Sequence, residues 1–64
     1  MEVDSRLIRQ LVWASKQELP DLAVSIDASE KSIYKWMNGT SLPDATHLYR
    51  LMQLAGWLAR QDHQ

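Results

Sequence analysis

The chain contains no cysteine, and this constrains its fold because it has only 64 residues. Domains of this size bury a small core and usually need disulfides, a metal or a partner chain to supplement it. Disulfides are excluded, and His47 and His63 have no cysteine partners at a zinc-binding spacing. We expect no metal and no cofactor, and a single domain over residues 1–64.

The composition indicates a folded chain that lies outside membranes. Hydrophobic residues make up 45% and charged residues 23%, as in ordinary globular domains. No apolar stretch approaches the roughly 20 residues of a membrane span. No signal peptide follows Met1, because charges come at Glu2, Asp4 and Arg6. The sequence predicts a cytoplasmic protein.

Helix-forming residues dominate, and no stretch alternates apolar and polar residues as a strand does. We therefore expect an all-α fold of four or five helices. Caps and breakers place them from Asp4 to about 16–17, over about 19–26, over about 30–38, and from Asp44 to Gly56. Trp57 and Leu58 would begin a last turn before a polar tail at about 61–64.

Two helices show clear apolar faces at 100° per residue. The first face has Val3, Leu7, Ile8, Leu11, Val12, Ala14 and Ser15, opposite Arg6, Arg9, Trp13 and Lys16. The last face has Ala45, Leu48, Tyr49, Leu51, Met52 and Ala55, with Arg50 outside it. The face of the last helix predicts that Tyr49 and Met52 lie in the core. Trp36 is likewise expected at a core position of the helix over about 30–38. His47 and His63 are expected to be exposed to solvent.

The segment from Leu22 to Pro43 combines a short helix, a tight turn, a capped second helix and a glycine stop, which is the pattern of a helix-turn-helix. Its marker residues are Leu22, Ala23, Asp27, Ala28, Ser29, Ser32, Ile33, Trp36, Asn38, Gly39 and Pro43. With Leu48 and Leu51 after them, they resemble the lambda-repressor-like, Cro-type (XRE) family of DNA-binding proteins. The resemblance extends from about Leu7 to Trp57.

The resemblance implies a compact helical domain that binds an operator in double-stranded DNA, commonly as a homodimer. The second helix of the motif would lie in the major groove. The matching base-contacting positions are Glu30, Lys31 and Lys35, with Ser32 and Tyr34 beside them. The matching backbone-contacting positions are Asn38, Thr40, Ser41 and, through its N–H, Leu19. Glu30 has a second interpretation, since a carboxylate also favours a helix N-terminus.

The chain departs from the family at several positions. Asp27 stands where the turn often has glycine, and Glu18 and Leu19 replace polar residues at the start of the motif. Val12 and Met37 occupy positions that often hold a buried ion pair, and an apolar pair can replace one without loss of stability.

Trp13 and three apolar residues near the end of the chain are candidate contact residues. Leu54, Trp57 and Leu58 lie where family members dimerise, although such residues can also pack on their own core. Trp13 lies on the charged side of its helix, and we expect Arg9 or the tail to cover it, with an interface as the alternative. Arg6 and Arg9 either reach a phosphate or only aid solubility.

The net charge of −1 does not by itself suggest nucleic-acid binding. Residues 29–43, however, have Lys31 and Lys35 against Glu30, a local net charge of +1. We expect a sequence-specific DNA-binding regulator, a repressor of the phage, plasmid or mobile-element kind. The alternative is a protein-interaction module, antitoxin-like or adaptor, on the same fold. Enzyme activity and a small-molecule ligand are not expected, because no catalytic motif or phosphate loop is present.

Overall fold

Polar side chains fix the starts of three helices in the computed structural model, which describes residues 2–58. Asp4, Ser29 and Asp44 each accept a hydrogen bond from the backbone N–H three residues later, at 2.9, 3.0 and 3.4 Å. Such bonds satisfy amides that have no partner within the helix. The caps expected from the sequence are confirmed.

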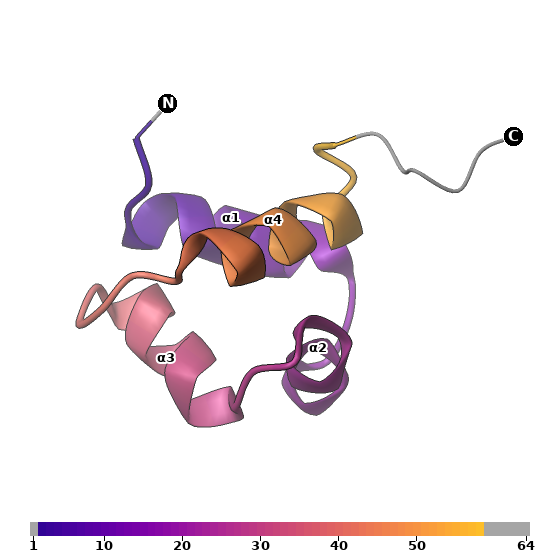
Figure 1. Ribbon diagram of the computed structural model, residues 1–64, viewed down its shortest axis with the longest axis horizontal. Helices are drawn as coiled ribbons and strands as arrows, with labels where there is room; N and C mark the ends of the chain where they lie inside the picture. Colours follow the sequence, from indigo (N-terminus) through magenta and orange to yellow (C-terminus); the bar gives the residue numbers. More distant parts are fainter. Residues whose placement is uncertain (1, 59–64) are drawn as a thin grey trace, which may run out of the picture.

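The described residues form four helices, α1 (Ser5–Ser15), α2 (Leu19–Ile26), α3 (Glu30–Asn38) and α4 (Ala45–Leu54), and no strand. Both α1 and α2 pack against α3 and α4. Figure 1 shows α1 and α4 on one side of the molecule, with α3 and α2 on the other. The all-α class and the two helices over 19–26 and 30–38 are confirmed. A fifth helix is absent up to residue 58, and the polar tail at 61–64 lies outside the described residues.

Three of the helices end at a residue with left-handed backbone, namely Lys16 (φ 59°), Asp27 (φ 59°) and Gly39 (φ 82°). Glycine adopts this conformation without strain, whereas a side chain makes it costly. At Asp27 the backbone N–H donates to the carbonyl of Val24 (3.2 Å), and the chain then turns into α3 after three residues. The short turn fixes how α2 and α3 are placed relative to each other.

The core is entirely apolar within residues 2–58. Its buried members are Leu7, Ile8, Leu11, Leu22, Ala23, Ile26, Ile33, Trp36 and Leu51. Val12 and Met37 are half-buried against it, as expected of an apolar pair. Trp36 is confirmed as a core residue.

The predicted core face of α4 is wrong at two positions. Ala45 is exposed and Tyr49 is 46% exposed, whereas Leu51 is fully buried. The helix packs through a narrow strip, with Leu48 and Met52 half-buried beside Leu51. Helical periodicity assigned a broader apolar face to α4 than the other helices cover. Ala45 and Tyr49 lie on the part of that face that stays uncovered.

None of the helices within residues 2–58 combines the length and the apolar character that a bilayer crossing requires.

Candidate nucleic-acid interface

The α3 helix separates its residues cleanly into a buried and an exposed side. Ile33 and Trp36 are buried in the core. The predicted base-contacting residues Glu30, Lys31 and Lys35 are all exposed, and Tyr34 is 52% exposed. Within the described residues neither lysine forms an ion pair. The structure therefore brings these four side chains together on one open helix face.

Ser32 differs from the other predicted base-contacting residues because it is half-buried and bonded at the start of α3. Its backbone N–H donates to Ser29 Oγ, and the two hydroxyls lie 3.0 Å apart in a hydrogen bond. The pair closes the first turn of the helix. The primary role that the structure shows for Ser32 is to position this turn.

The predicted backbone-contacting residues Asn38, Thr40 and Ser41 are exposed around the end of α3. The backbone N–H groups of Thr40 and Ser41 both donate to the carbonyl of Lys35, at 2.9 and 3.4 Å. These amides are occupied within the chain, so the hydroxyls and the Asn38 amide are the groups available to a ligand.

Leu19 begins α2 and is half-buried against the core. The preceding residue, Glu18, makes no capping hydrogen bond with its side chain within the described structure. The N–H groups of Leu19 and Asp21 in the first turn of α2 therefore donate no capping bond to the Glu18 side chain, and Pro20 between them has no N–H to donate.

A histidine and an arginine of α4 contact the end of α2, and sequence reasoning missed both contacts. His47 Nε2 lies 3.0 Å from the backbone carbonyl of Asp27, and Arg50 donates from a terminal nitrogen to the carbonyl of Ile26 at 3.3 Å. The last carbonyls of a helix have no partner within the helix and carry partial negative charge, so cations stabilise them. These contacts fix the turn that orients α3.

The side chain of His47 is 27% exposed and the residue is half-buried, so the prediction that His47 is exposed is wrong. Its Nδ1 bonds to the carboxylate of Asp44, and its ring lies 5.6 Å from that of Trp36 between ring centres. A carbonyl and a carboxylate can only accept, so both ring nitrogens must donate, which requires the charged imidazolium. The spacing of Asp44 at the cap and histidine three residues later is a signal for this pair that the sequence analysis did not use.

The same contacts change two pKa values. The hydrogen bond to the Asp27 carbonyl, followed by the bond to Asp44, raises the pKa of His47 above its ordinary 6.5. The hydrogen bond from His47 lowers the pKa of the Asp44 carboxyl below its ordinary 3.8. Arg50 acts in the opposite direction on His47 by charge repulsion, but it does not outweigh the two acceptors.

One hydrogen bond joins α1 directly to the end of α3. Arg9 donates from a terminal nitrogen to the backbone carbonyl of Met37 at 2.7 Å. This acceptor is a backbone atom, so no residue pattern in the sequence indicates it. The bond holds the C-terminal end of α3, next to Asn38, against α1.

Trp13 is 82% exposed, so the prediction that Arg9 covers it is wrong. Arg9 contacts Met37 instead of stacking on the indole. The other expected cover, the tail at 61–64, lies outside the described residues. Trp13 is an exposed aromatic side chain on the surface of α1.

The three candidate dimer residues differ in exposure. Trp57 is 46% exposed, whereas Leu54 and Leu58 are half-buried, Leu54 against the core. The Trp57 backbone N–H donates to the carbonyl of Met52 at 2.9 Å, after Gly56 turns the chain with φ 81°. Pairing of two chains through these residues stays a prediction.

Comparison of this chain with protein-family models, with curated proteins and with solved structures finds no match.

Proposed function

We propose that this chain is a sequence-specific regulator that binds double-stranded DNA through a lambda-repressor-like helix-turn-helix. In this proposal α2 and α3 are the two helices of the motif, and the exposed face of α3 lies in the major groove. The groove of B-DNA is about 12 Å wide and admits a single helix. The chain would act in the cytoplasm as a repressor of the phage, plasmid or mobile-element kind, and it would repress transcription by occupying its operator.

The observation that carries the proposal is the composition of the open side of α3. Lys31, Tyr34 and Lys35 are exposed together, and within residues 2–58 neither lysine forms an ion pair, although Glu30 lies on the same face. A lysine donates well to O6 and N7 of guanine or to a phosphate. Ile33 and Trp36 secure the opposite side of the helix in the core, so the exposed side chains project from a fixed support.

The contacts on either side of α3 support the same proposal. His47 and Arg50 hold the turn before α3, and Arg9 holds the residue next to its end. A helix that reads base edges needs a fixed position, because small displacements lose directional hydrogen bonds. In a symmetric dimer the two α3 helices would read half-sites one helical turn, about 34 Å, apart.

Selection of bound sequences from a random duplex pool tests the proposal. We expect one enriched sequence, and a palindrome if the chain binds as a dimer. Lys35→Ala should weaken binding to that sequence by at least about tenfold, since a good base contact contributes roughly 1–3 kcal/mol.

Lys16→Gln is the matched control for that variant. Lys16 is also an exposed lysine, but it lies at the end of α1 and outside the α3 face. Removal of its charge should change affinity for the selected duplex far less than Lys35→Ala does. Equal losses in the two variants, or no enriched sequence, would contradict the proposal.

A protein-interaction role is the second candidate, and the exposed indole of Trp13 is the observation that favours it. If this role were the only one, duplex DNA would not bind even at low salt, where phosphate contacts are strongest.

A further inference from the structure

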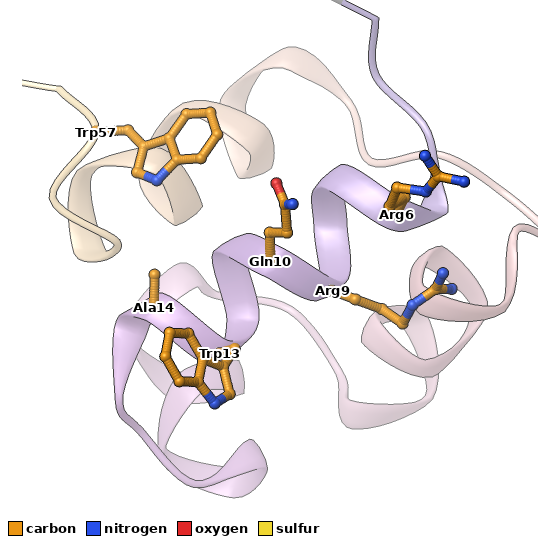
Figure 2. A pocket seen from close by; sticks show the side chains of 6 residues that line it. All are labelled: Arg6, Arg9, Gln10, Trp13, Ala14 and Trp57. Carbon is orange, nitrogen blue, oxygen red and sulfur yellow. The ribbon is translucent and has the colours of Figure 1, made fainter.

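A groove of about 500 Å³ lies between α1 and the segment that follows α4. It is lined by Arg6, Arg9, Gln10, Trp13, Ala14 and Trp57. In Figure 2, Ala14 lies between the two indoles, and the two arginines come from the earlier turns of α1. No residue of α3 lines this groove, so it is separate from the surface proposed to bind DNA.

The indoles leave much apolar surface uncovered within the described structure. Trp13 is 82% exposed and Trp57 is 46% exposed. Tryptophan is enriched among the residues that contribute most to protein–protein binding, because it brings a large rigid surface and an N–H donor. Ala14 has a small side chain, and it leaves the space between the indoles open.

The charges of the groove determine which partner it fits. Arg6 and Arg9 supply two guanidinium groups, and no carboxylate of residues 2–58 lines it. Arg9 uses one donor on the Met37 carbonyl and keeps its other donors. A second copy of this face would bring two more arginines and, from its described residues, no carboxylate. It would therefore offer Arg6 and Arg9 no opposite charge, whereas an acidic segment offers one.

We propose that this groove binds an acidic, amphipathic peptide segment of another protein. A large apolar side chain of the segment lies between Trp13 and Trp57, above Ala14. Carboxylates of the same segment pair with Arg6 and Arg9, since a guanidinium binds a carboxylate through two parallel hydrogen bonds. The proposal does not depend on DNA contact by α3, because none of the predicted base-contacting residues lines the groove.

Fluorescence anisotropy with a labelled probe peptide tests the proposal. The probe is a short peptide that alternates glutamate with leucine and phenylalanine. Two matched probes replace glutamate by glutamine, or the apolar residues by serine. We expect the first probe to bind and both matched probes to bind at least about tenfold more weakly.

Four variants of the full chain locate the site. Trp13→Ser and Ala14→Leu should each weaken binding of the first probe by about tenfold, the first by removing an indole and the second by filling the space. Arg6→Gln should weaken it by about threefold, and more at low salt than at high salt. Val24→Ser is the matched control, because Val24 is likewise 82% exposed but lies on α2. It should bind as the wild type does.

Circular dichroism confirms that each variant is folded, which is expected because Trp13 and Arg6 are exposed. The proposal is overturned if the wild type does not bind the first probe, if the glutamine probe binds equally well, or if Trp13→Ser binds unchanged. Displacement of the peptide by single-stranded oligothymidylate at lower concentration would identify nucleic acid as the occupant instead. A dimer in sedimentation that Trp13→Ser converts to monomer would identify a second copy.

Failure of this proposal is distinguishable from failure of the proposed function. Trp13→Ser should keep the affinity of the chain for its selected duplex, and Lys35→Ala should keep its affinity for the peptide. A variant that loses both would show that the two surfaces are not independent, and that result contradicts the proposal made here for the groove.

Discussion

His47 on α4 contacts the backbone carbonyl of Asp27, the left-handed residue between α2 and α3, at 3.0 Å. The two residues are 20 positions apart in the chain. Arg50, one turn further along α4, contacts the preceding carbonyl at Ile26. The start of α4 therefore acts as an external cap for the end of α2, a helix that ends in an aspartate and not in a glycine.

The His47 contacts predict a pH-dependent stability. The pKa of His47 is raised above 6.5, so its contribution is fully present below that pH and is lost as the pH rises through the raised pKa. The pKa of Asp44 is lowered, so its contribution is present above 3.8 and is lost as the pH falls through the lowered pKa. The His47–Asp44 pair therefore stabilises the folded chain most at pH values between the lowered pKa of Asp44 and the raised pKa of His47.

Urea unfolding of the wild type and of His47→Gln measures this contribution. The free energy of unfolding should differ more between the two proteins at about pH 5.5 than at about pH 8.5. The two proteins differ only at residue 47, so the comparison isolates the contribution of His47. A difference that stays constant with pH would contradict the assignment of the charged imidazolium.

Arg9→Ala should reduce the free energy of unfolding by about 0.5–1 kcal/mol, because it removes an exposed hydrogen bond between α1 and the Met37 carbonyl. Arg6→Ala is the control on the same exposed side of α1, and it should have a smaller effect on urea unfolding. Equal effects of the two substitutions would indicate that the bond contributes nothing to stability.

Lys16→Gly should raise the free energy of unfolding by about 0.5 kcal/mol. Relief of the left-handed backbone at φ 59° gains roughly 1–2 kcal/mol, and the greater freedom of glycine in the unfolded chain offsets part of it. Lys16→Ala removes the same charge but keeps a Cβ atom, so it should give no gain. Thermal unfolding monitored by circular dichroism separates the two outcomes.

Leu51→Ala and Tyr49→Ala should differ sharply in their effect on stability, although the two residues are only two positions apart in α4. Leu51 is fully buried, and its truncation should cost about 2–5 kcal/mol, a large part of the stability of so small a domain. Tyr49 is 46% exposed, and its truncation should change stability by only about 0.5 kcal/mol. A large loss from Tyr49→Ala in urea unfolding would show that the predicted core position was right after all.

If the chain binds DNA as proposed, its affinity should depend only weakly on salt. Few cations lie on the α3 face, so the plot of log affinity against log salt should have a slope of about −2 to −3 per chain. Lys31→Ala should bring that slope closer to zero by about one unit if Lys31 contacts a phosphate. Titrations of the selected duplex at several salt concentrations provide the measurement, and an unchanged slope would place Lys31 on a base or in solvent.

The helices were predictable because their signals are local. Asp4, Ser29 and Asp44 precede the helices as caps, and Gly39 ends α3, so each boundary depends on a few neighbouring residues. The exposed face of α3 was predictable from helical periodicity. With Ile33 and Trp36 buried, only the opposite side of this short helix is left exposed.

Contacts between distant segments were not predictable in the same way. His47, Arg50 and Arg9 each contact a backbone carbonyl, and a carbonyl is present at every residue, so no side-chain pattern marks the acceptor. The exposure of Tyr49 depends on how much of α4 the other helices cover, which is a property of their packing and not of the α4 sequence.

The contacts from α4 to the end of α2 also imply an order of events during synthesis. The carbonyls of Ile26 and Asp27 emerge from the ribosome before the side chains that contact them. Until residue 50 has been added and has left the exit tunnel, the turn between α2 and α3 lacks the side chains of His47 and Arg50, and Leu51 is missing from the core. The support of α3 is therefore completed only after the start of α4 has left the exit tunnel.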